Sequence, residues 1–193
     1  MNFSGRYPIP AQPQAVFLAL HDPEILKACI TGCEQVERVS DNEYRAKASI
    51  GIGPVRAKFE GKVMLKPEEA PHGFTHAITL SGEGQGGAAG FARGEALVRL
   101  SAIEDGTALE YEAKANVGGR LAQLGQRLID GAARTLADDF FAKFASLMRE
   151  RAPDIPKPQA PTGPRDENLV PQVWVVGMIG VVILLLILFG IVL

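Results

Sequence analysis

One stretch of the chain reads Gly118-Gly-Arg-Leu-Ala-Gln-Leu-Gly-Gln-Arg-Leu-Ile-Asp-Gly-Ala-Ala-Arg-Thr-Leu-Ala-Asp-Asp-Phe-Phe-Ala-Lys-Phe-Ala-Ser-Leu-Met-Arg149, and it decides the fold. Its apolar residues recur every three or four positions, which is the spacing of one helix face. They are Leu121, Leu124, Leu128, Ala132, Leu136, Phe140, Phe144 and Leu147. The sequence therefore predicts one long amphipathic helix from about Arg120 to Arg149, whose apolar face another layer must cover.

Upstream of this helix the apolar period changes to two, which is typical of half-buried strands. The clearest strand covers residues 55–65, where Val55, Phe59 and Val63 alternate with basic and acidic residues. The same alternation predicts strands at 3–9, 36–39, 44–50, 74–80, 96–100 and 109–117. Pro13 and the pair Asp22-Pro23 predict the starts of two short helices. This order predicts an α+β domain over residues 1–150, in which a curved antiparallel sheet grips the long helix.

The last part of the chain differs in character from this domain. Prolines crowd residues 151–172, which favours an extended linker. The run from Val173 to Leu193 has no charged residue and no proline, and Trp174 lies near its start. As a helix, these residues would span roughly 30 Å, the thickness of a bilayer core. We therefore expect a single-pass C-terminal membrane anchor at residues 173–193.

Composition limits the possible compartments and partners. The formal net charge of the 193 residues is −2, so no basic field attracts nucleic acid. The N-terminus lacks the basic start and apolar run of a signal peptide, so we expect the domain on the cytoplasmic side of the membrane. In a reducing compartment, Cys29 and Cys33 are not expected to form a disulfide.

Two sequence motifs could indicate a zinc site and a dinucleotide site, but the surrounding residues favour neither. Cys29 and Cys33, with His72 and His76, could supply zinc ligands, but neither pair has the tight spacing of a zinc knuckle. The glycines between Gly82 and Gly87 match G-x-G-x-x-G, yet a dinucleotide site needs a parallel βαβ unit. We expect no metal site, and a glycine-rich hairpin at one lip of a cavity mouth.

The inward rows of the predicted sheet contain many small residues, among them Ala46, Ala48, Gly61, Ala96 and Ala113. Small side chains leave space between sheet and helix. One outcome is a large apolar cavity. The other is a close approach of the helix to the sheet, with Gly125 permitting the contact and no void remaining.

Several segments resemble the G-subunit family of carbon monoxide dehydrogenase, within the START-like (SRPBCC) superfamily of helix-grip ligand binders. The most specific is Gly118-Gly-Arg-Leu-Ala-Gln-Leu-Gly-Gln-Arg-Leu128 together with Phe140-Phe141. Others are Phe3-Ser-Gly5, Ile30-Thr-Gly-Cys33, Ile52-Gly-Pro-Val55 and Phe59-Glu-Gly61. The resemblance covers about residues 1 to 150. Thr31 departs from it, since proline is expected before Gly-Cys.

The resemblance implies a helix-grip fold with a deep hydrophobic cavity. It implies a non-catalytic accessory protein that recruits a carbon monoxide dehydrogenase-type molybdenum hydroxylase to the cytoplasmic membrane. It also implies a respiratory quinone as the bound hydrophobic molecule, with no covalent cofactor. The expected cavity-lining residues are Phe17, Tyr44, Ala48, Phe59, Gly61, Phe74, His76, Ile78, Tyr111, Ala113, Leu121, Gly125, Leu128, Ala132, Leu136 and Phe140.

Two other functions remain open at this point. The domain could be a pure membrane anchor and docking platform that binds no ligand. It could also be a START-like enzyme acting on a lipophilic substrate, with His76 and Tyr111 as acid–base groups. The spacing of the residues shows no Ser-His-Asp or Cys-His arrangement and no paired carboxylates.

Overall fold

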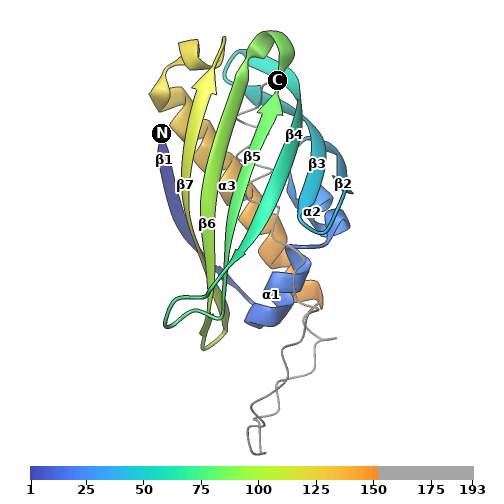
Figure 1. Ribbon diagram of the computed structural model, residues 1–193, viewed down its shortest axis with the longest axis vertical. Coiled ribbons are helices and arrows are strands. Elements are labelled where there is room, and N and C mark those ends of the chain that lie inside the picture. Colours follow the sequence, from blue (N-terminus) through green and yellow to red (C-terminus); the bar gives the residue numbers. More distant parts are fainter. Residues whose placement is uncertain (152–193) are drawn as a thin grey trace, which may run out of the picture.

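The computed structural model describes residues 1–151. Within them, seven strands form one antiparallel sheet in the order β1-β7-β6-β5-β4-β3-β2, and the sheet curves around α3 (Figure 1). No helix within this range is both long and apolar enough to cross a membrane. The anchor predicted at residues 173–193, and all but Arg151 of the predicted linker, lie outside the described residues.

Each predicted strand is present, and the chain order is the expected one. The elements are β1 (Asn2–Ile9), α1 (Pro13–Ala19), α2 (Pro23–Cys29), β2 (Cys33–Arg38), β3 (Glu43–Ile52), β4 (Val55–Glu68), β5 (His76–Gln85), η1 (Gly87–Ala89), β6 (Phe91–Ile103), β7 (Gly106–Gly118), η2 (Ala122–Leu124) and α3 (Gln126–Arg151). From β2 to β7 each strand pairs with the next, and β1 returns to pair with β7. Successive turns therefore lie at alternate ends of the sheet.

The long helix begins later than the periodicity predicts, at Gln126 instead of Arg120. Residues 122–124 form the separate 3-10 turn η2, and Gly125 follows with φ +82°. Residues with a side chain rarely adopt this left-handed conformation, so Gly125 breaks the chain direction before α3 starts. Because η2 and α3 are separate, Leu121 and Leu124 are not in register with the helix face.

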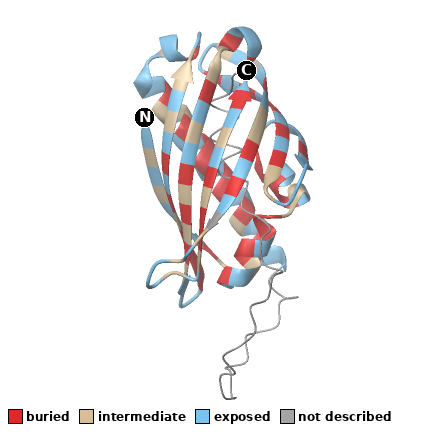
Figure 2. Ribbon diagram, in the orientation of Figure 1, coloured by how far each residue is buried: buried red, intermediate tan, exposed pale blue. Residues whose placement is uncertain are grey.

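The core lies between α3 and the inner face of the sheet. Buried and exposed positions alternate along the strands, as period-two patterning requires (Figure 2). The buried face of α3 consists of Ile129, Ala133, Leu136, Ala137, Phe140, Phe141, Phe144 and Met148. This face shares only Leu136, Phe140 and Phe144 with the predicted one.

Two connections differ from the sequence-based expectation. β5 continues through Gln85, so most of the glycine-rich segment is strand, and only residues 86–90 form the turn. That turn packs closely on the end of β7, since a Cβ on Gly90 would lie 2.2 Å from the Gly118 carbonyl oxygen. Phe74 precedes β5 instead of belonging to it.

Asp22 caps α2 as predicted, and this contact gives a first test. Its side chain accepts a hydrogen bond of 2.9 Å from the Glu24 amide, and Pro23 occupies the first helical turn. Asp22→Ala should lower the free energy of unfolding by about 1 kcal/mol, because the helix start loses its acceptor. Urea denaturation measures this loss. Asp22→Asn is the matched control and should keep most of the stability, so an equal loss in both variants would contradict a capping role.

Candidate functional site

The region between α3 and the sheet is the candidate ligand site, and most predicted lining residues lie there. Ten are buried: Phe17, Tyr44, Ala48, Phe59, Ile78, Tyr111, Ala113, Leu121, Leu136 and Phe140. Gly61, His76 and Ala132 are half-buried. Their role in binding a ligand remains a prediction.

Three predicted residues lie elsewhere. Leu128 is 49% exposed, because each four-residue step drifts by about 40° around an α-helix, so Leu128 lies far from the face that Phe140 and Phe144 share. Gly125 is exposed, with no atom near its missing side chain, so it serves a backbone turn instead of a close helix–sheet contact. The Phe74 ring lies 5.4 Å from the Arg99 guanidinium, and Arg99 pairs with the exposed Glu112. Phe74 therefore lies on the outward side of the sheet.

One ring cluster surrounds Phe17 of α1. The centroid of its ring lies 4.3 Å from that of His21 and 4.3 Å from that of His76. His21 is 6% exposed, and its Nδ1 donates a hydrogen bond to the Phe17 carbonyl oxygen. Burial lowers the pKa of His21 from 6.5 to about 3, and it also lowers the pKa of His76. Both imidazoles are therefore neutral at pH 7.

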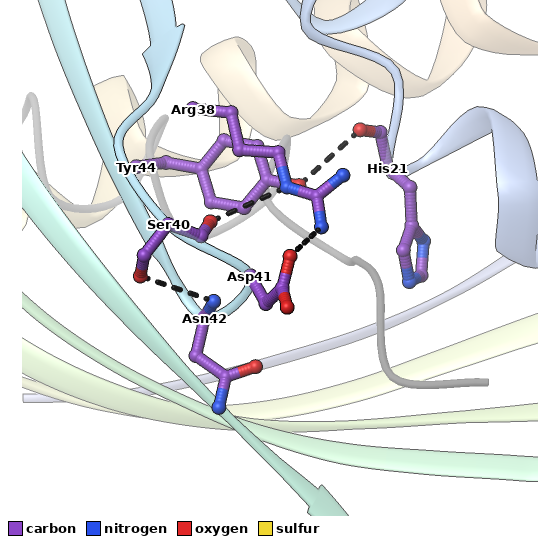
Figure 3. A network of polar contacts seen from close by, with 6 residues as sticks. All are labelled: His21, Arg38, Ser40, Asp41, Asn42 and Tyr44. Atoms are coloured by element: carbon purple, nitrogen blue, oxygen red, sulfur yellow. Dashed lines mark hydrogen bonds and ion pairs between the residues drawn. The ribbon is translucent and has the colours of Figure 1, made fainter. Parts of the chain in front are cut away.

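Polar contacts connect this cluster to the turn between β2 and β3 (Figure 3). The Tyr44 hydroxyl donates to the His21 carbonyl oxygen at 3.4 Å. Arg38 donates to the Ser40 carbonyl at 3.3 Å and to Asp41 at 2.8 Å, and its guanidinium lies 6.0 Å from the Tyr44 ring centroid. The network fixes the α1–α2 junction against the sheet.

A second ring cluster lies where β1 meets α3. Tyr7 stacks on Phe141 with 4.0 Å between ring centroids, and Tyr111 lies 6.3 Å from Tyr7 in a nearly parallel plane. The Tyr7 hydroxyl donates to Asp138 at 2.8 Å. Burial, with the neighbouring Asp138, raises the pKa of Tyr7, and burial raises the pKa of Tyr111. Both hydroxyls remain protonated donors at neutral pH.

Sequence patterning missed His21, Tyr7 and Phe141 as site residues. Tyr7 occupies a predicted inward position of β1, and Phe141 follows a predicted core residue, so both carried a weak signal. His21 lies in a short connection with no periodic pattern, and contacts from α1 and β3 bury it. His76 and Tyr111, the candidate acid–base pair, belong to two different ring clusters.

The cysteines behave as structural thiols. Cys29 is fully buried, and burial raises its pKa to about 11. Cys33 is half-buried, and its pKa is also raised by burial. Within residues 1–151, no group of three or more His, Cys, Asp or Glu side chains is placed to hold a metal ion.

The outward face of the sheet carries a groove of about 630 Å³. Its floor includes the small residues Ser81, Gly82 and Gly94, and charged side chains from β4 to β7 surround it. Gly82 and Gly94 are antiparallel partners, so this glycine-rich segment is not part of a parallel βαβ nucleotide site.

Comparison with known proteins agrees with this architecture. The sequence model of the CoxG family, the G-subunit of carbon monoxide dehydrogenase, matches residues 5–148. No curated protein matches the chain. Among solved structures, a conserved protein from Geobacillus kaustophilus is 32% identical, with a TM-score of 0.70, over 78% of this chain and 97% of its own.

Two more distant structures share the fold. A START superfamily protein from Mycobacterium smegmatis is 12% identical, with a TM-score of 0.59, over 77% of this chain and 97% of its own. The Zhui aromatase/cyclase from Streptomyces sp. R1128 is 8% identical, with a TM-score of 0.55, over 78% and 94%. The START-like fold is thus shared, and the match over residues 5–148 shows that the chain belongs to the CoxG family of carbon monoxide dehydrogenase G-subunits.

Proposed function

We propose that this chain is a non-catalytic, membrane-tethered accessory protein of a carbon monoxide dehydrogenase-type molybdenum hydroxylase. It holds a respiratory quinone between α3 and the sheet and brings the enzyme to the membrane. The observation that carries the proposal is the family match over residues 5–148. The tether rests on the uncharged run from Val173 to Leu193.

The chemistry of the interior supports binding over proton transfer. A general acid or base works best with a pKa near the working pH. Burial moves the pKa values of His21 and His76 downward and those of Tyr7 and Tyr111 upward, away from neutrality in every case. Aromatic rings and neutral hydrogen-bonding groups suit an apolar, planar molecule with carbonyl oxygens.

The proposed tether explains how the domain would meet both its ligand and its partner enzyme. A membrane anchor confines the domain to a small volume near the lipid, which raises the effective concentration of both quinone and enzyme. Transfer of an isoprenoid tail from lipid to an apolar interior exchanges one apolar environment for another. The step therefore needs no large driving force.

The test compares the quinone content of three full-length proteins, each purified from native membranes in the same detergent. Wild type should carry quinone well above the lipid background. Ala132→Trp should reduce it by at least about fivefold, because the indole at this half-buried position would occupy space that a bound quinone needs, and fivefold corresponds to about 1 kcal/mol of binding free energy. Leu18→Trp is the control, since Leu18 is 52% exposed on α1. Mass spectrometry of organic extracts measures the ratio of quinone to protein.

The measured quinone content distinguishes a quinone-binding protein from a docking platform that binds no ligand. A quinone content at the lipid background in all three proteins would contradict ligand binding and leave the anchor function. Ala132→Trp must also show a far-UV spectrum and a melting transition like those of wild type. A lower quinone content then reflects a blocked binding site and not an unfolded domain.

A further inference from the structure

The two ends of the domain differ strongly in charge. Because successive turns alternate between ends, the segments 51–56, 85–91 and 118–128 gather at one end, where α3 begins (Figure 1). They contain three exposed arginines, Arg56, Arg120 and Arg127, and no acidic residue. We call this the arginine end. Within residues 1–151, none of the three arginines has an ion pair.

Contacts join these segments into one surface. The Leu121 amide donates to the Ala89 carbonyl at 3.0 Å, which ties η2 to the β5–β6 turn. Leu128 lies beside the β3–β4 turn, since its Cδ2 would be 3.9 Å from a Cβ on Gly53. Leu128 is 49% exposed, so the arginines flank an apolar side chain that reaches solvent.

The opposite end is acidic. Segments 20–24, 39–43, 68–76 and 103–106 carry eight acidic residues and no lysine or arginine. The last turn of α3 also lies at this end and adds Arg149 and Arg151, of which Arg151 lies 4.0 Å from Asp22. Some of these acids pair with neighbouring bases. Glu24, Glu69, Glu104 and Asp105 have no ion pair among the described residues. Exposed apolar residues occur here too, including Leu18 at 52% and Val39 at 49%, so charge is what distinguishes the ends.

From this asymmetry we propose that the arginine end docks on an anionic bilayer surface while the acidic end faces away. Cytoplasmic leaflets carry negative lipids, which attract arginine by about 1 kcal/mol per residue and repel exposed carboxylates. Leu128 then meets the boundary between headgroups and acyl chains. The inference rests on the proposed membrane function and adds to it which surface of the domain meets the lipid.

The chain leaves the described domain at the acidic end, yet its length permits this orientation. α3 has 26 residues and at 1.5 Å per residue is about 39 Å long. Residues 152–172, at about 3.1 Å per residue if extended, reach roughly 65 Å. The linker is therefore long enough to return along the domain from Arg151 to a bilayer beneath the arginine end.

Two matched fluorescent probes test the orientation in the full chain. Leu128→Cys and Leu18→Cys, each with Cys33→Ser, are labelled with an environment-sensitive fluorophore. Cys29 stays unlabelled, because it is buried and burial raises the pKa of its thiol. The proteins are reconstituted into phosphatidylcholine vesicles with or without phosphatidylglycerol, and lipids with a quencher on the headgroup report proximity.

We expect strong quenching of the Leu128 label and weak quenching of the Leu18 label in anionic vesicles. Arg56→Glu, Arg120→Glu and Arg127→Glu together should lower the equilibrium constant for docking by about a hundredfold or more, since each arginine contributes about fivefold to it. Equal quenching of both labels, stronger quenching at Leu18, or no dependence on phosphatidylglycerol would overturn the inference.

The same samples distinguish failure of the tether from failure of the docking surface. Extraction with alkaline carbonate releases the protein if residues 173–193 do not anchor it, and that result would contradict the proposed tether. Vesicles added to the released protein would still quench the Leu128 label selectively if the arginine end binds anionic lipid.

Discussion

Replacing Phe140 with alanine should lower the free energy of unfolding by about 3 to 5 kcal/mol, the range found for large aromatic side chains removed from packed cores. Phe140 is fully buried at the middle of α3. Its ring meets Phe141 edge-on, with 5.2 Å between centroids, and stacks on Phe144 at 5.9 Å. Alanine removes these contacts together with the transfer free energy of the ring. Chemical denaturation at pH 7 measures the change.

Leu128→Ala is the matched control on the same helix. Because Leu128 is half exposed, its truncation should cost about 1 kcal/mol or less. A loss below about 1 kcal/mol for Phe140→Ala would contradict a tightly packed interior at this position. It would mean that the ring borders space available to a ligand, so this experiment also bears on the two interpretations of the small inward residues.

The strands could be predicted from sequence because each one buries a single face. In β3, Tyr44, Ala46, Ala48 and Ile50 are buried, and the intervening positions are exposed, as the alternation indicates. The cap of α2 could also be predicted, since Asp22 and Pro23 act locally. Strand alternation and helix caps therefore predicted the order of the elements. That order in turn predicted a sheet packed around one long helix.

The start of α3 and the positions of several site residues could not be predicted from the three- and four-residue spacing of the apolar residues alone. Gly125 looked like any small residue on an apolar face, but its backbone conformation separates η2 from α3. Leu128 is exposed because repeated four-residue steps drift by about 40° each around an α-helix, so it cannot share one face with Phe144. Phe74 lies outside its expected row because β5 begins only at His76, and the burial of His21 comes from contacts with Phe17 and Tyr44 that strand and helix spacing does not predict.

The stability of the domain should fall steeply with acidification, and His21 should be a major cause. Above pH 6.5 the imidazole is neutral in both the folded and the unfolded state. Below pH 6.5 the unfolded chain binds a proton at His21. The folded protein binds this proton only near pH 3, because burial disfavours the charged imidazole. Stability is therefore lost as the pH falls from about 6.5 to 3, by about 5 kcal/mol in total at roughly 1.36 kcal/mol per pH unit.

The neighbours of His21 strengthen this effect. Arg38 from β2 and His76 from β5 both disfavour a positive charge on the ring, and only the Phe17 carbonyl favours it. The Nε2 atom is buried and has no hydrogen-bond partner within residues 1–151, so a proton added there would gain no acceptor. Protonation should thus loosen the junction between α1 and α2.

His21→Asn isolates this contribution, because its amide can donate to the Phe17 carbonyl in place of Nδ1 but does not titrate. Urea denaturation at a series of pH values gives the free energy of unfolding for both proteins. Between pH 6.5 and 3 the slope for the variant should be smaller by about one proton, and the variant should lose several kcal/mol less than wild type. Parallel curves for the two proteins would show that carboxylates, and not the buried imidazole, control acid unfolding.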